Sequence, residues 1–211
     1  TGVEEFETGE IMIDGCDHAI INRSPQEAQN RGISTVYQEV NLCPNLTVAE
    51  NLFIGREPRK GGLIDWKTMN KKASKLLQDL DIHADVTQTI DNYSIAIQQM
   101  VAIARAVDMS AKVLILDEPT SQLDPIAASD FLETVKKINR DLGTTIILTE
   151  HRLEEVFPSA DRVVVMDEGQ ILCVGTPPEI GEELKKRNHE MFLAMPVPMQ
   201  VYAKVESEQP C

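Results

Sequence analysis

The sequence predicts an α/β protein, with a mostly parallel sheet and helices on both of its faces. Two apolar runs, "VLIL" at 113–116 and "TIIL" at 145–148, are short enough and apolar enough to be buried strands of such a sheet. A helix pattern separates them, with Asp124 as N-cap, Pro125 at the first helical position and Gly143 as the stop. A strand, a helix and a second strand in this order require parallel pairing with a right-handed crossover.

The remaining elements extend this core. Alternating apolar and polar residues predict strands at 9–15 and 32–39, and Ser24 begins a helix between them. A strand pair that turns at "DEG" within 161–175 predicts a small antiparallel part.

A helical insertion interrupts the sheet. Helices are expected after Asp65 and from Ser94. The predicted division is a core, a helical subdomain and a C-terminal tail, spanning 1–40 with 112–184, 41–111, and 185–211.

Composition excludes several classes of function. Among 211 residues, 34 acids against 20 bases give a net charge of −14, which opposes binding to nucleic acid over a broad surface. No apolar stretch approaches the ~20 residues of a membrane-spanning helix, and the N-terminus has no signal-peptide pattern. The four cysteines are scattered without a CxxC pair, so neither a zinc site nor a disulfide framework is indicated and a reducing cytoplasm is expected.

Polar side chains follow the two central strands. Asp117 and Glu118 come directly after the first strand, and His151 follows the second. Ligands of open parallel sheets bind at the carboxyl edge, so an acid pair and an imidazole are expected there side by side. Each has a plainer reading alone, as acids that solvate a strand end or a histidine with satisfied hydrogen bonds. Together they suit metal-assisted attack of water on a phosphoryl group.

Four stretches resemble the ATPases of ATP-binding cassette (ABC) transporters. "LILDEPTSQLD" is similar to their Walker B strand, catalytic glutamate and D-loop, "TEH" to the switch histidine, "VYQE" to the Q-loop, and "YSIAIQQMVAIARA" to the signature helix. They occur in the family's order. The resemblance implies a P-loop NTPase-like fold, ATP and Mg²⁺ as cofactors, and catalytic roles for Glu118, His151 and Gln38. It also implies that Asp117 and Gln38 hold the metal ion.

The signature and D-loop resemblances imply contacts across a dimer. Ser94 and Ala96 would grip the γ-phosphate of a nucleotide bound to a second ATPase subunit or half, and Asp124 would lie at that interface. The helix start agrees, because exposed amides there bind anions. Ile95 stands where the family has glycine, and its branched side chain restricts close backbone approach. The bland reading of Ser94 is an ordinary N-cap.

The resemblance also divides along the chain. Residues 33–120 are most similar to the first ATPase half of bacterial sugar importers, and residues 145–202 to energy-coupling-factor and cobalt-type ATPases. The chain therefore either mixes features of two subfamilies or is a composite.

The phosphate-binding loop is absent from these residues, since no GxxxxGK[ST] occurs in them. We expect that the first strand and this loop lie upstream of Thr1 and that the chain alone binds ATP poorly. Three hypotheses follow. The first is an ATPase subunit of a sugar importer, on the inner face of the membrane with permease subunits and, indirectly, a solute-binding protein. The others are a non-catalytic interaction module and a soluble ABC-type ATPase unrelated to transport.

Overall fold

The structure is a computed structural model of the chain, and it describes residues 11–13, 24–37, 41–151 and 153–206, with the side chains of 202–206 left aside. Contacts divide the chain into two compact units, 1–149 and 150–211, and each is described by itself.

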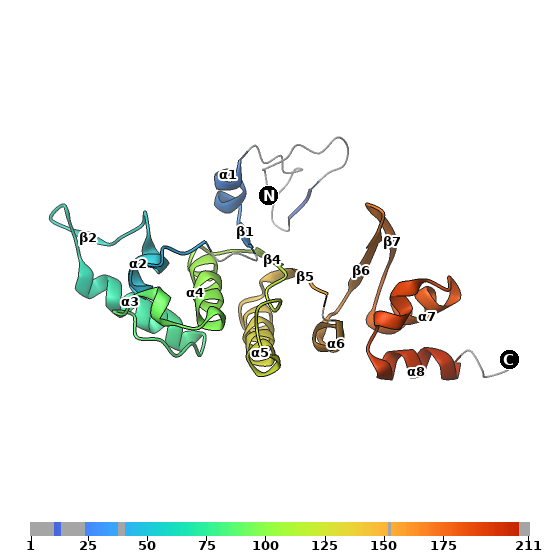
Figure 1. Cartoon of the computed structure of the whole chain (residues 1–211). Coiled ribbons are helices and arrows are strands. Elements are labelled where there is room, and N and C mark those ends of the chain that lie inside the picture. The colour runs from blue at the N-terminus through green and yellow to red at the C-terminus, as the bar shows by residue number, and fades with distance from the viewer. Residues whose placement is uncertain (1–10, 14–23, 38–40, 152, 207–211) are drawn as a thin grey trace. The chain divides into compact units, whose positions relative to one another are not determined.

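The first unit contains a parallel sheet, coloured blue to yellow in Figure 1. Its strands are β1 (Ile33–Val36), β4 (Val113–Asp117) and β5 (Thr145–Thr149), in the order β1-β4-β5. Both pairs are parallel, and Asp117 is the partner of Thr149 in the register. The predicted strand-helix-strand unit is thereby confirmed.

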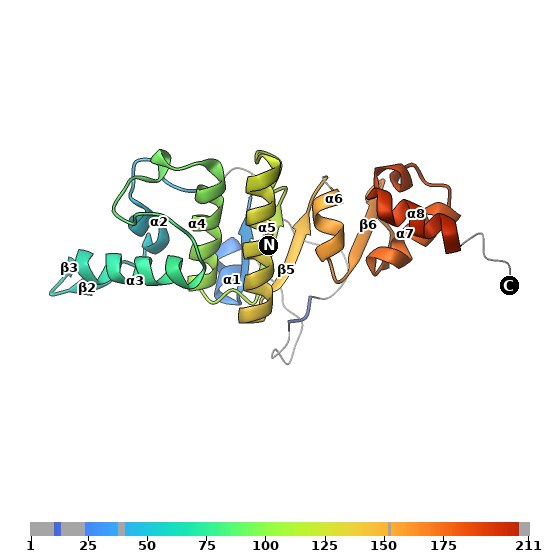
Figure 2. The same cartoon turned by 90° about the horizontal axis from the view of Figure 1, so that it is seen from below.

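Helix α5 (Pro125–Leu142) connects β4 to β5 and packs against β5 and α4, as Figure 2 shows. It begins where predicted, because the Asp124 carboxylate accepts hydrogen bonds from the backbone N–H groups of Ile126 and Ala127, both at 3.0 Å. It ends at Gly143, whose φ of 66° is the left-handed conformation that favours glycine. Phe131 and Ile138 of this helix are buried.

One expectation about the sheet is wrong. The strand that contains "TIIL" was expected to be buried, but Thr145, Ile147 and Thr149 of β5 are exposed, Ile147 by 50%. The reason is position: within the described residues, β5 lies at an edge of its sheet, whereas Leu114 and Leu116 of the central strand β4 are fully buried.

The helical insertion forms a second layer of this unit. Its elements are α2 (Val48–Phe53), β2 (Arg59–Lys60), β3 (Leu63–Ile64), α3 (Trp66–Asp79), the 3-10 turn η1 (Ile90–Asn92) and α4 (Ile95–Asp108). The helices α2, α3 and α4 pack against one another (Figure 1). As predicted, α3 starts after Asp65 and α4 after Ser94. Apolar side chains from all three helices are fully buried between them: Val48, Leu52, Met69, Ala73, Val101 and Ile103.

At the N-terminal side, α1 (Pro25–Asn30) begins after Ser24 as predicted, and the Ser24 hydroxyl accepts a hydrogen bond from the Glu27 N–H at 3.2 Å. The strand expected at 9–15 lies largely outside the described residues, and its described part, 11–13, has no regular secondary structure.

The second unit, 150–211, contains the predicted hairpin. Its elements are α6 (Leu153–Val156), the 3-10 turn η2 (Phe157–Ser159), β6 (Val163–Asp167), β7 (Gln170–Gly175), α7 (Pro177–Lys186), the 3-10 turn η3 (Glu190–Ala194) and α8 (Val197–Glu206). The strands β6 and β7 are antiparallel, as expected from "DEG". The hairpin and α7 enclose a small apolar core of Phe157, Val165, Ile180, Leu184, Phe192 and Met195.

Candidate functional site

The acid pair lies at the carboxyl end of β4. Asp117 is the last residue of that strand and is exposed, and Glu118 follows it with a φ of 42°. A positive φ is unusual for a residue with a β-carbon and costs about 1–2 kcal/mol unless the surroundings hold it. Such strain at a polar strand end is typical of functional positions.

The neighbouring strand holds this conformation. The Glu118 backbone N–H donates to the carbonyl oxygen of Thr149 at 3.1 Å and lies 3.2 Å from the Thr149 hydroxyl oxygen. The same hydroxyl donates to Asp117 Oδ1 at 2.7 Å. Sequence reasoning missed Thr149. The signal that finds it is the strand register, which sets Thr149 directly beside Asp117.

The turn after Glu118 is closed locally. The Ser121 hydroxyl and backbone N–H both donate to the Glu118 carbonyl, at 2.8 Å and 3.2 Å. Thr120 is fully buried in this turn, and its carbonyl accepts from the Leu123 N–H at 3.0 Å. The chain then enters α5 through Asp124, which is occupied as the N-cap. Asp124 and the acid pair therefore lie on one short, hydrogen-bonded connection.

Magnesium fits the acid pair better than a metal with a full protein cage. No group of three or more His, Cys, Asp or Glu side chains that could hold a metal ion occurs among the described residues. Mg²⁺ keeps several waters and takes only one or two carboxylates, with phosphates as the other ligands. Asp117 presents one exposed carboxylate of this kind. Gln38, the other expected ligand, lies outside the described residues.

His151 belongs to the second unit, two residues beyond the end of β5. It is exposed, and its backbone N–H donates to Glu150 Oε2 at 3.1 Å. It borders a hollow of about 400 Å³ within this unit, together with Leu153 of α6 and Met195 and Gln200 near α8. The expected neighbourhood of His151 and the acid pair stays a prediction.

Ser94 lies at the start of α4 in the helical insertion. Its hydroxyl accepts from the Ile97 N–H at the long distance of 3.5 Å. Ile95 is 42% exposed, and Ala96 is partly exposed. The structure therefore shows Ser94 as an N-cap on an accessible helix start, and its expected contact with a nucleotide stays a prediction.

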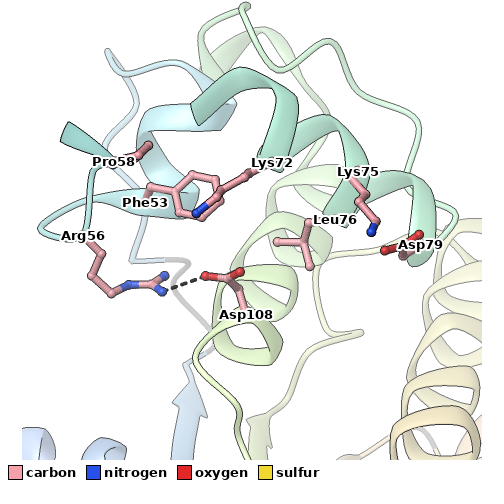
Figure 3. Close-up of a pocket in the computed structure, with 8 residues that line it drawn as sticks. All are labelled: Phe53, Arg56, Pro58, Lys72, Lys75, Leu76, Asp79 and Asp108. Atoms are coloured by element: carbon pink, nitrogen blue, oxygen red, sulfur yellow. Dashed lines mark hydrogen bonds and ion pairs between the residues drawn. The ribbon is translucent and has the colours of Figure 1, made fainter. Parts of the chain in front are cut away.

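A second hollow, of about 400 Å³, lies within the helical insertion and is drawn in Figure 3. Arg56 donates to Asp108 Oδ2 at 2.7 Å and to the Leu52 carbonyl at 2.9 Å, and its guanidinium stands 5.9 Å from the centre of the Phe53 ring. The lining comes from α2, α3, α4 and the segment after α2: Phe53, Arg56, Pro58, Lys72, Lys75, Leu76, Asp79 and Asp108.

A parallel sheet with an acid pair at its carboxyl edge and a helical insertion between two of its strands is the architecture of an ATP-binding cassette. The chain belongs to the ABC transporter family, whose family model matches residues 1–121. No helix among the described residues has the length and apolar character needed to cross a membrane.

The sequence relatives are sugar import proteins. The chain is 44% identical over 172 residues to the galactofuranose transporter ATP-binding protein YtfR of Escherichia coli K12, covering 82% of this chain and 34% of that protein. It is 35% identical over 203 residues to the ribose import ATP-binding protein RbsA of Geobacillus kaustophilus, covering 95% and 39%. The chain thus spans about a third of the length of these relatives.

Solved structures agree with the fold. The chain is similar to CbiO1 of Clostridium perfringens, part of the ABC transporter complex CbiONQ, with a TM-score of 0.71 and 26% identity over 95% of this chain and 78% of that one. It is similar to the ADP conformation of the cassette MJ1267, with a TM-score of 0.72 and 26% identity over 97% and 80%. The predicted resemblance to both sugar importer and cobalt-type ATPases is confirmed.

Proposed function

We propose that this chain is part of the ATP-hydrolysing subunit of a bacterial ABC importer, and that the importer carries a sugar. The observation that supports it most is the hydrogen-bonded edge formed by Asp117, Glu118 and Thr149, in a chain whose relatives are named for sugar import. The sugar itself is chosen by other parts of such an importer, so no solute is assigned.

The chain's own residues would divide the chemistry as follows. Asp117, with Gln38, would hold Mg²⁺, which when bound neutralises phosphate charge. Glu118 would polarise the attacking water, and His151 would donate to the γ-phosphate. Ser94 and Ala96 would bind the nucleotide of a second ATPase subunit through the amides of α4, with Asp124 near that interface.

The test is ATP hydrolysis by the chain expressed with any coding sequence that precedes Thr1 in its gene. Glu118→Gln should lower kcat by about 100-fold or more, because general-base catalysis contributes that much. Glu133→Gln, on an exposed position of α5, is the matched control and should keep the rate. Equal hydrolysis by both variants would contradict the assignment of Glu118.

Permease subunits are the proposed membrane partners, and they would keep the chain on the cytoplasmic face. The hollow of Figure 3 is the proposed contact, since it combines an apolar wall of Phe53 and Leu76 with the cationic side chains of Lys72 and Lys75. Lys72→Glu should reduce co-purification with permease subunits encoded beside the gene. Lys136→Glu, exposed on α5, is the control. Unchanged co-purification of the Lys72 variant would remove this surface from the proposal.

A second candidate is a non-catalytic interaction module. It is favoured by one observation, the lack of a GxxxxGK[ST] loop in these 211 residues. Equilibrium dialysis of the chain as given against ATP with Mg²⁺ separates the two candidates. Micromolar binding would exclude the module, whereas no binding would favour it for the chain alone.

A further inference from the structure

We propose that Thr149 is a positioning residue, whose hydroxyl sets the orientation of Asp117 and Glu118 for the hydrolysis proposed above. The inference rests on that proposed function. It starts from an observation that the function did not use: one hydroxyl on β5 contacts both members of the acid pair on β4.

The direction of each hydrogen bond is fixed by chemistry. An ionised carboxylate only accepts and a backbone N–H only donates, whereas a hydroxyl does both. The Thr149 hydroxyl must therefore give its single proton to Asp117 Oδ1, at 2.7 Å, and offer a lone pair to the Glu118 N–H, at 3.2 Å. Neither bond can reverse, so the arrangement has one hydrogen-bond pattern.

The two bonds act on different degrees of freedom. The bond to Oδ1 is charge-assisted and restrains rotation of the Asp117 side chain, while it engages only one of the two carboxylate oxygens. The bond from the Glu118 N–H, shared between the hydroxyl and the carbonyl of Thr149, holds the backbone at its positive φ. The β-branched side chain of threonine is itself stiff, which makes it a rigid reference for both acids.

Stability gives little reason for these bonds. Asp117 and Thr149 are both exposed, so water could replace either partner in the folded protein. What water cannot provide is a fixed orientation. A misplacement of about 1 Å at a catalytic group can lower a rate by about 100-fold, so orientation is where the hydroxyl has its effect.

Three variants isolate the hydroxyl. Thr149→Val has nearly the same shape without the hydroxyl, Thr149→Ser retains the hydroxyl, and Thr145→Val makes the same chemical change four residues earlier on β5, where the side chain is also exposed. A residue that only filled space would tolerate valine better than serine. A positioning hydroxyl requires the opposite order.

The first measurement needs no nucleotide. In NMR spectra of the chain as given, the side-chain carboxyl ¹³C resonance of Asp117 and the amide resonance of Glu118 should both move in Thr149→Val. They should stay near their wild-type positions in Thr149→Ser and Thr145→Val. Unmoved resonances in Thr149→Val would overturn the proposal.

The second measurement is ATP hydrolysis by the chain with any upstream coding sequence, with Glu118→Gln as reference. Thr149→Val should lower kcat by about 10- to 100-fold with little change in KM, and Thr149→Ser should remain within about twofold of wild type. Wild-type kcat in Thr149→Val, with Glu118→Gln inactive, would overturn the role of Thr149 and leave the proposed function standing. Absence of hydrolysis in the wild type would overturn the proposed function, and the positioning role with it.

Discussion

The side chain of Asn51 binds both backbone polar groups of Cys43. Asn51 Oδ1 accepts from the Cys43 N–H at 2.7 Å, and Nδ2 donates to the Cys43 carbonyl at 3.0 Å. Nδ2 also lies 3.2 Å and 3.0 Å from the carbonyls of Leu46 and Thr47. Asn51 is fully buried on α2, so the loop at 43–47 is attached to the helical insertion through one amide group.

Replacing Asn51 should loosen this attachment. Asn51→Leu leaves the Cys43 N–H without its side-chain acceptor, and unsatisfied groups of this kind cost about 1–3 kcal/mol each. We expect the free energy of unfolding, measured in urea, to fall by about this amount. Asn92→Leu is the control, because Asn92 is exposed and its amide donates only to the nearby Thr89 hydroxyl in the described contacts. Equal losses in both variants would contradict a special role for Asn51.

The backbone at Glu118 predicts an unusual order of stabilities. Its φ of 42° penalises any residue with a β-carbon, so Glu118→Gly should be more stable than Glu118→Ala by about 1 kcal/mol. At Glu133, an exposed position inside α5, the order should reverse, because glycine costs about 1 kcal/mol relative to alanine in a helix. Thermal unfolding of the four variants measures both differences. A Glu118→Ala protein as stable as Glu118→Gly would show that the backbone there carries no strain.

Local signals explain what the sequence predicted well. The starts of α3, α4 and α5 depend on a capping side chain a few residues away, and Asp65, Ser94 and Asp124 all cap as expected. The exposure of β5 was missed because burial of a strand depends on which strands flank it, not on its own residues. Thr149 was missed for a related reason. Its contact with Asp117 follows from pairing between residues 32 positions apart.

The same distinction applies to the candidate site. Asp117 and Glu118 could be selected because two acids directly follow an apolar run, which is a pattern within a few residues. Asn51 carries no such pattern, since an asparagine in a short helix reads as a surface residue until its burial is known. Residues that orient other groups through tertiary contacts are the ones that a single sequence conceals.

The capping interaction at α7 predicts a pH dependence of stability. Glu179 Oε2 accepts from the Thr176 N–H at 2.7 Å and from the Thr176 hydroxyl at 2.9 Å, and these bonds lower the pKa of the Glu179 carboxyl below its usual value. Because the pKa is lower in the folded state, the stabilisation is complete above the unfolded-state pKa and is lost as the pH falls through the folded-state pKa.

Glu179→Gln should therefore be less stable than wild type at neutral pH and should approach it in acid. Unfolding in urea at a series of pH values measures the difference. Glu179→Asp retains a carboxylate but shortens the side chain by one methylene, so it should lose most of the pH-dependent advantage. A constant gap between wild type and Glu179→Gln across the acid range would contradict the capping assignment.

Substitutions at Ser94 can separate its structural role from its proposed contact with a nucleotide. As an N-cap with a 3.5 Å bond, Ser94 should contribute at the low end of the usual range, so Ser94→Ala should cost about 0.5 kcal/mol in unfolding free energy. Ser94→Asp keeps a good cap and adds a negative charge that the helix dipole favours, so stability should hold or rise slightly. The same charge would repel a γ-phosphate at this helix start, so ATP hydrolysis by the chain with any upstream coding sequence should fall. Asp65→Ser makes the reverse exchange at the N-cap of α3 and should leave hydrolysis unchanged. Full hydrolysis by a stably folded Ser94→Asp variant would restrict Ser94 to its capping role.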